Sequence, residues 1–131
     1  MILTFKPQFV EPIKNGTKIH TIREDKKGRW KPGTKIHFWN GNPRNVKAKP
    51  HQFQSGICTD VESITLDFKN DNVFFVGGIA IIKDIDKLDK FAKNDGFENW
   101  NLMKDWFFEN YEGKKIFFRM RLIHFKVYAT I

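Results

Sequence analysis

The sequence predicts an α+β domain in which strongly bent strands form an open or closed β-barrel flanked by three short helices. Apolar residues alternate with period two through several segments, and in the last segment this alternation changes phase, which a single flat strand does not accommodate. Two consecutive glycines, Gly77 and Gly78, interrupt another apolar run, as they do at a sharp bend. Only three short stretches are expected to be helical, so the strands dominate the prediction.

The first third of the chain is punctuated by turn residues that separate short apolar segments. Pro12 limits the first helix, and Asn15-Gly16 ends it. A later turn contains Pro32 and precedes a strand with Ile36 and Phe38 on one face. The expected elements are a strand over 2–5, a helix over 8–14, a strand that starts with residues 20–23, a turn over 28–33, a strand over 34–39 and a polar loop over 40–50.

The remainder reads as a hairpin, two helices and a final strand. Strands over 56–68 and 73–82 flank the turn residues Asn70-Asp71-Asn72. Two helical stripes follow. They consist of Leu88, Phe91 and Ala92 in the first helix and of Leu102, Met103, Trp106, Phe107 and Tyr111 in the second. In the final strand the alternation of Ile116, Phe118, Met120 and Leu122 shifts to that of Ile123, Phe125 and Val127, so we expect a bulge or bend there.

Length and composition limit the class of protein. The 131 residues are interpreted as one domain, 1–131, and 14 Phe and 4 Trp suffice for a hydrophobic core. The single cysteine, Cys58, has no partner within the chain, and the first residues lack the features of a signal peptide, so we expect a reducing, cytoplasmic setting. No apolar stretch approaches the roughly 20 residues of a membrane span, which predicts no membrane insertion.

The positive charge is concentrated at one end of the chain. Of the net charge of +8, residues 1–50 contribute 12 Lys/Arg against 3 Asp/Glu, whereas residues 51–131 contribute 11 against 12. Such an asymmetric field attracts phosphates, so the first fifty residues are expected to bind an anionic or nucleotide-like ligand. The alternative is a solvated face that only keeps the protein soluble.

Within this basic region, Lys18, Thr21 and Arg23 form a candidate constellation. Strand alternation places Thr21 and Arg23 opposite Ile22, which is expected to face the core. Lys18 joins them if the chain is still a turn at that point, which Gly16 favours. A hydroxyl would then lie between two cations.

These residues belong to a wider pattern that resembles the ASCH domains of the PUA-like superfamily. The pattern consists of Gly16-x-Lys18-x-x-Thr21-Ile22-Arg23, then Trp30-Lys31-Pro32-Gly33, then Ala92-x-x-Asp95-Gly96-Phe97, and finally Trp106-Phe107 and Tyr111. It spans nearly the whole chain in the expected order. The resemblance implies a PUA-like β-barrel and a cleft suited to RNA or to a modified nucleoside or nucleotide, with no cofactor.

The first motif is also similar to that of small bacterial amidohydrolases that remove the acetyl group from N4-acetylcytidine. In that resemblance Lys18 and Thr21 match the catalytic lysine and threonine. Asp95 occupies the position of the catalytic glutamate and is shorter by one methylene. The resemblance thus implies Lys18, Thr21 and Asp95 as catalytic residues.

Amide hydrolysis by a hydroxyl requires a base, and a lysine with an ordinary pKa of about 10.4 is almost fully protonated at neutral pH. The pKa of Lys18 therefore has to be lowered, which burial and Arg23 favour. Arg23 can hold an oxyanion or a phosphate, and Asp95 can return a proton to the leaving amine. In the alternative interpretation, Lys18 and Arg23 only contact phosphate and Asp95 ends a helix.

Further binding candidates are Trp30, whose ring can stack on a base, and Arg44, in a loop that can close over a ligand. Trp39 could also stack on a base, but core packing is its expected role, and the alternative for the loop that contains Arg44 is a mobile surface loop. The four histidines show no paired metal spacing, and the chain has one cysteine, so no metal site is predicted. An interaction protein is a third functional class, suggested only by the aromatic residues of the last helix.

Overall fold

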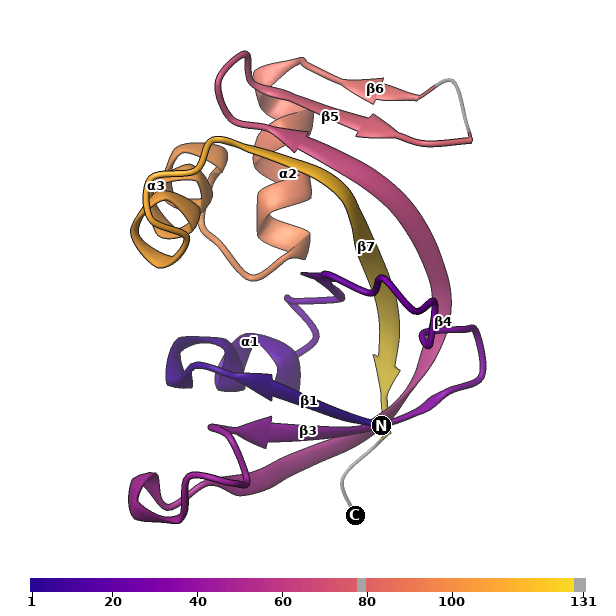
Figure 1. Ribbon diagram of the computed structural model, residues 1–131, viewed down its shortest axis with the longest axis vertical. Coiled ribbons are helices and arrows are strands. Elements are labelled where there is room, and N and C mark those ends of the chain that lie inside the picture. Colours follow the sequence, from indigo (N-terminus) through magenta and orange to yellow (C-terminus); the bar gives the residue numbers. More distant parts are fainter. Residues whose placement is uncertain (78–79, 129–131) are drawn as a thin grey trace.

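The chain adopts a mixed α+β fold in this computed structural model, which describes residues 1–77 and 80–128. Within these residues, three α-helices and two 3-10 turns accompany seven strands that join in one mixed sheet (Figure 1). The helical elements are η1 (Pro7–Phe9), α1 (Val10–Lys14), η2 (Val46–Ala48), α2 (Ile85–Asn94) and α3 (Trp100–Asn110). The strands are β1 (Ile2–Phe5), β2 (His20–Arg23), β3 (Lys35–Asn40), β4 (His51–Asp67), β5 (Asn72–Phe75), β6 (Ile81–Ile82) and β7 (Ile116–Val127).

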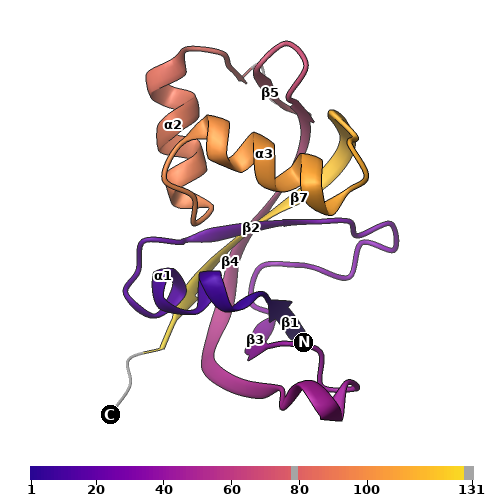
Figure 2. The ribbon, with the colours of Figure 1, turned by 90° about the vertical axis from the view of Figure 1, so that its left-hand side faces the viewer.

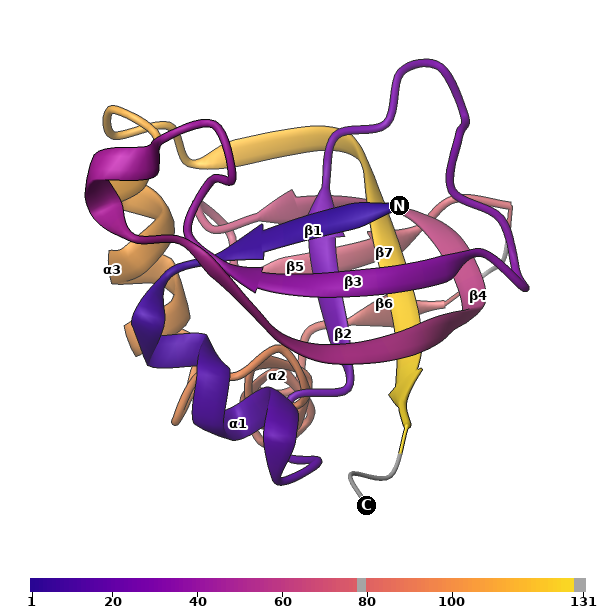
Figure 3. The same ribbon diagram turned by 90° about the horizontal axis from the view of Figure 1, so that it is seen from below.

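The long, curved strand β4 organises the sheet. Its first half pairs with β3, its second half pairs with β5, and β7 pairs antiparallel along its other edge. β7 then pairs with β2, while β1 lies parallel to β3. Figure 3 shows β1 and β3 side by side, with β2 crossing behind them. The sheet therefore runs from β1 through β3, β4 and β7 to β2.

This sheet is not closed into a barrel, so of the two forms expected from the sequence, open or closed, the closed form is not found. Among the described residues, no backbone pairing joins the two end strands, β1 and β2. Instead the Nη2 atom of Arg23 in β2 donates a hydrogen bond of 2.7 Å to the carbonyl oxygen of Thr4 in β1. The carbonyl that a closing strand would use is thus occupied by a side chain.

The expected irregularity of the last strand is confirmed and has two parts. Two β7 residues, Phe118 and Arg119, oppose one residue of β4, and Arg119 has a φ of +52°. A second bulge adds one residue to β4 between Cys58 and Asp60. The expected alternation is wrong at its start, because the first bulge leaves Phe118 70% exposed and buries Phe117 instead.

Both residues at the phase change, Leu122 and Ile123, are buried, at 1% and 0% exposure. Their side chains point to opposite faces of β7 by strand alternation. Phe125 on the face of Ile123 packs against Phe38. Both faces of β7 are therefore covered, which explains why its apolar pattern has no single parity.

The strand expected over 73–82 is instead two strands. β5 and β6 pair antiparallel, with Val73 opposite Ile82, and Gly77 has a φ of +87° in the connection. The glycines therefore mark a reversal of the chain rather than a bend within one strand, although Gly78 lies outside the described residues. The helix expected over 8–14 divides into η1 and α1, and β4 begins five residues earlier than expected, at His51.

The helices position the candidate site. Figure 2 shows β2 running between α1 on one side and α2 and α3 on the other. Apolar residues of α2 and α3, among them Leu88, Trp100 and Met103, are almost fully buried. None of the described helices is long and apolar enough to span a bilayer.

Candidate functional site

A pocket of about 340 Å³ lies among β1, β2, α3 and the turn between α2 and α3. This volume is in the range of small-molecule sites. Its polar lining includes Lys18, Thr21, Arg23 and Asp95. Its apolar lining is largely aromatic, with Phe5, Phe9, Phe97, Trp106, Phe107 and Tyr111.

Lys18 extends into this pocket from the turn that follows α1. Its backbone N–H donates to the carbonyl oxygen of Pro12 at 2.9 Å, and Gly16, with a φ of +83°, allows the chain to reverse. The side chain is only 3% exposed, and its Nζ atom lies 5.0 Å from the ring centroid of Phe9. A cation is thus held against an aromatic wall, which favours its charged form.

Asp95 supplies the polar partner of Lys18 from the end of α2. Nζ of Lys18 donates to the backbone oxygen of Asp95 at 2.5 Å and lies 3.5 Å from its Oδ1 atom. Oδ1 also lies 2.9 Å from Nδ1 of His20. Since the C-terminal carbonyls of a helix carry partial negative charge, both the backbone and the side chain of Asp95 attract the amine.

The helix end that presents Asp95 is a Schellman motif. The N–H of Phe97 bonds to the oxygen of Ala92, and the N–H of Gly96 bonds to the oxygen of Lys93. Gly96 has a φ of +95°, and a Cβ atom built on it would lie 2.9 Å from Cδ of Lys18. The backbone at Gly96 therefore packs directly on the lysine stem, so this glycine is needed for close approach as well as for its conformation.

Thr21 and Arg23 enter the pocket from β2, as their shared parity predicts. Nε of Arg23 donates to Oγ1 of Thr21 at 3.3 Å, and its Cζ atom lies 4.8 Å from the ring centroid of Phe5. Ile22, expected to face the core, is buried at 5% exposure, although part of it also borders the pocket. The sequence thus identified the residues on this strand that line the pocket.

Burial and charge determine the protonation of the two pocket cations. Burial lowers the pKa of Lys18 from 10.5 to about 8, Asp95 opposes this shift, and Arg23 adds to it. At pH 7.5 roughly a quarter of such lysines are neutral, compared with about one in a thousand for a free lysine. Burial also lowers the pKa of Arg23, but a guanidinium remains charged at neutral pH.

The structure brings together four of the six candidate residues, Lys18, Thr21, Arg23 and Asp95. Trp30 is not among the lining residues of this pocket. It is 9% exposed, belongs to the hydrophobic core and borders a separate hollow beside Asp25 and Lys26. Arg44 is exposed and also absent from the lining, while its neighbours Gly41 and Asn42 contribute to it.

Sequence reasoning did not assign His20 or the aromatic walls to the site. His20 is buried at 3% exposure, and its ring lies 5.1 Å from that of Phe91. Its contact with Asp95 joins residues 75 positions apart, and spacing alone does not reveal such a pair. Phe9, Phe97 and Trp106 contact one another edge to face, and Trp106 was expected in an apolar helical stripe and in the ASCH-like pattern but not as a binding residue.

This arrangement suits binding of an anionic or polar group between aromatic walls. Lys18 and Arg23 supply positive charge, and Thr21 supplies a hydroxyl. In this arrangement the hydrogen bond of the Lys18 amine goes to Asp95, and that of the Thr21 hydroxyl is made with Arg23. Attack by Thr21 would therefore require the amine to rotate from Asp95 towards the hydroxyl.

Comparison of the chain with known protein families, with curated proteins and with solved structures gives no match.

Proposed function

We propose that the chain is an ASCH-type, PUA-like domain that binds a nucleoside or nucleotide, free or within RNA, in the pocket around Lys18. The observation that carries the proposal is a pair of largely desolvated cations, Lys18 and Arg23, inside a nucleoside-sized aromatic pocket. The curled path of β1, β3, β4, β7 and β2, with Arg23 joining its ends, supports a PUA-like, open form of barrel.

The recognition chemistry follows from the lining. Aromatic side chains stack on bases, a contact worth about 1–3 kcal/mol per base in single-strand binders. Trp106 and Tyr111 are the less buried members of the wall and are available for such contact. Arg23 and Lys18 are placed to donate hydrogen bonds to phosphate or carbonyl oxygens of the ligand.

Binding can be tested with a pair of isosteric variants. Lys18→Met and Arg23→Met are expected to weaken binding of a short single-stranded RNA at least tenfold, because each removes a charge inside the pocket. Lys27→Met, a change in an exposed residue, is the matched control. Affinity is measured over a range of salt concentrations, since phosphate contacts make it fall steeply with salt. RNA binding that is absent at low salt, or equal in all three variants, contradicts the proposal.

Hydrolysis of N4-acetylcytidine or a related acylated nucleoside is the second candidate function. It is favoured by the convergence of Lys18, Thr21 and Asp95 on one pocket and by the lowered pKa of Lys18. In this reaction Oγ1 of Thr21 attacks the acyl carbon while neutral Lys18 takes the hydroxyl proton. Arg23 holds the oxyanion, Asp95 relays the proton to the leaving N4 amine, and water then hydrolyses the threonine ester.

The assay is release of cytidine from N4-acetylcytidine. Thr21→Ala is expected to abolish release while it leaves binding of the substrate within a fewfold of wild type. Asp95→Glu, which restores the missing methylene, is expected to increase turnover. Release that is absent from both the wild-type chain and Asp95→Glu excludes this second function and leaves the pocket as a binding site.

A further inference from the structure

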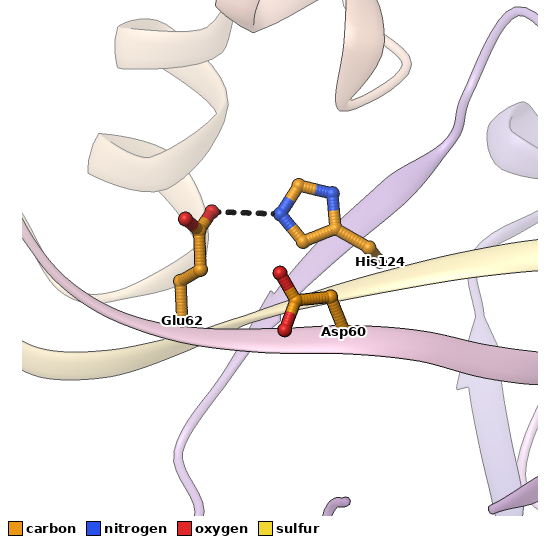
Figure 4. Close-up of side chains that lie close together, drawn as sticks. All are labelled: Asp60, Glu62 and His124. Atoms are coloured by element: carbon orange, nitrogen blue, oxygen red, sulfur yellow. Dashed lines mark hydrogen bonds and ion pairs between the residues drawn. The ribbon is translucent and has the colours of Figure 1, made fainter. Parts of the chain in front are cut away.

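On the β4–β7 pair, outside the pocket lining, Asp60, Glu62 and His124 form a second cluster (Figure 4). One ligand atom from each residue lies within 4.8 Å of the others. Nε2 of His124 is 2.8 Å from Oε2 of Glu62. We propose that this cluster is a binding site for a divalent transition-metal ion of the Zn²⁺ type.

Sheet geometry brings these three side chains to one face. Asp60 and Glu62 are two residues apart on β4, so their side chains point the same way. The bulge between Cys58 and Asp60 sets the register in which Asp60 lies opposite His124. In a regular ladder Thr59 would lie opposite His124, but the bulge leaves Thr59 unpaired and places Asp60 there. Bulges often direct a side chain in this way.

The charges around the cluster favour a cation. Two carboxylates on one face of a strand repel each other unless a positive charge lies between them. The chain has 23 Lys and Arg residues, yet among its described residues none lies within ion-pair distance of Asp60 or Glu62. Within residues 1–77 and 80–128, His124 is the one basic side chain paired with these carboxylates, and a backbone N–H from Val61 donates to one oxygen of Asp60.

A third observation concerns the orientation of His124. Its ring meets the ring of His20 edge to face, with centroids 5.5 Å apart, and Nδ1 of His20 is held by Asp95. His20 lies opposite His124 in the β2–β7 pair, so the two histidines and Asp60 form a row across three strands. The imidazole is therefore packed from one side while Nε2 points at the carboxylates.

The ligand types indicate which ions fit. One imidazole nitrogen and two carboxylate oxygens match three-ligand Zn²⁺ sites, in which water completes the tetrahedron. Neighbouring ligand atoms are then roughly 3.3–3.5 Å apart, from metal–ligand distances of about 2.0–2.2 Å. The ligand atoms already lie within 4.8 Å of one another, and Asp60 is exposed and Glu62 partly exposed, so neither side chain is enclosed by the core. Mg²⁺ and Ca²⁺, which prefer oxygen ligands only, fit less well.

This inference differs from the sequence-based expectation of no metal site. That expectation considered the spacing of histidines and cysteines, whereas Glu62 and His124 lie on different strands and are 62 residues apart in the sequence. The inference is independent of the proposed function, since none of the three residues lines the pocket around Lys18.

The experiment is calorimetric titration of the full chain with ZnCl₂ near pH 7.5, repeated with MgCl₂. We expect one Zn²⁺ per chain and at least tenfold weaker Mg²⁺ binding. Asp60→Asn and His124→Gln are each expected to weaken Zn²⁺ binding at least tenfold, since even outer-shell changes reach this size. His51→Gln, an exposed histidine on the same strand, is the matched control and is expected to bind as wild type does.

Stability provides a second measurement, because an ion that binds only the folded state raises the melting temperature. Zn²⁺ is expected to raise the melting temperature of the wild type and of His51→Gln, but not that of His124→Gln. Circular dichroism checks that each variant folds. If His124→Gln does not fold because it loses the contact with His20, Asp60→Asn replaces it in this measurement. Absent Zn²⁺ binding, equal affinity for Mg²⁺, or unchanged affinity in both Asp60→Asn and His124→Gln overturns the proposal.

Discussion

Lys18 and the lysines between β2 and β3 carry the same charged group in opposite environments. Lys26 and Lys27 are exposed and surround a shallow hollow, whereas Lys18 is buried between aromatic rings and the end of α2. Of the twelve cations in the first fifty residues, Lys18 is buried, Arg23 is half-buried and the other ten are exposed.

The number of charged residues in a segment therefore does not by itself locate a binding site. An exposed lysine needs no partner because water solvates it, but a buried lysine requires polar or charged protein groups in place of water. Asp95, Arg23 and His20 form that environment, and each of them is constrained by the fold. The positive charge of the first fifty residues therefore lies partly on a solvated surface and partly in one pocket that the fold builds.

The largest expected effect on stability comes from removing the partner of the buried cation. Asp95→Ala is expected to lower the free energy of unfolding by about 3–5 kcal/mol, because it leaves Lys18 buried beside no carboxylate. Lys104→Met, which breaks the partly exposed pair with Asp71, is expected to cost at most about 1 kcal/mol. Urea denaturation measures both. Equal losses in the two variants would show that the pair in the pocket is solvated like a surface pair.

The pH dependence of stability also distinguishes buried Lys18 from the exposed lysines. Lys18 has a pKa of about 8 in the folded state and 10.5 without the protein environment. Between these values the unfolded chain binds more protons, so the free energy of unfolding rises with pH from about 8 upwards. Below about 8 both states are protonated, and the cost of burying the charge is present in full.

The difference between pH 8 and pH 9.5 is on the order of 2 kcal/mol. It is measured as the urea midpoint of the wild type relative to Lys18→Met, with Lys27→Met as the exposed control. A difference between wild type and Lys18→Met that does not change over this range would show that Lys18 titrates as a surface lysine does.

The same titration separates the two candidate functions. Binding of a nucleotide phosphate by charged Lys18 is expected to weaken as pH rises through about 8. Hydrolysis that uses neutral Lys18 as the base is expected to speed up over the same range. Nucleotide affinity and the rate of cytidine release, measured in parallel from pH 6.5 to 9.5, distinguish these dependences.

A smaller effect is expected at the glycine that contacts Lys18. Gly96→Ala adds a Cβ atom 2.9 Å from Cδ of Lys18, whereas Gly33, with a similar φ of +93°, has nothing within 4 Å of the added atom. The strain from positive φ is therefore common to both variants. We expect Gly96→Ala to cost about 1–3 kcal/mol more than Gly33→Ala and to weaken ligand binding. Equal costs in thermal or urea unfolding would show that the contact is unimportant.

The smallest effect is expected from the exposed cations. Replacing Lys26, Lys27 and Arg29 together by Gln is expected to change stability by no more than about 0.5 kcal/mol per substitution. The affinity for a mononucleotide should remain unchanged, while the salt dependence of RNA affinity becomes shallower if these residues contact phosphates. Fluorescence anisotropy at several salt concentrations measures both affinities. A large loss of mononucleotide affinity would show that the nucleotide binds at these surface residues rather than in the pocket around Lys18.

Local patterns were sufficient to predict much of the fold. Turn residues such as Asn15-Gly16 marked a helix end, and alternation placed Thr21 and Arg23 on one face. The α+β class and the irregular last strand followed from the same patterns. Whether the sheet closes into a barrel did not follow from them, because closure depends on whether two distant end strands share backbone hydrogen bonds.

Long-range contacts account for what the sequence did not reveal. His20 meets Asp95 across 75 residues, and the reversal at Gly77 resembles a bend within a strand when only spacing is considered. Trp30 shows a second limit of the sequence, since an aromatic residue in a basic segment suits base stacking, whereas the fold packs most of its surface into the core. Burial decides such cases, and burial is set by tertiary packing.

The most direct test of the pocket as a ligand site is calorimetric titration with the four ribonucleoside 5′-monophosphates near pH 7. The wild-type chain is expected to bind at least one of them with one ligand per chain. Lys18→Met and Arg23→Met are expected to weaken that binding at least tenfold, whereas the Lys27→Met surface variant binds as the wild type does. If no nucleotide binds, or if Lys27→Met loses as much affinity as Lys18→Met, the pocket around Lys18 is not the nucleotide site proposed here.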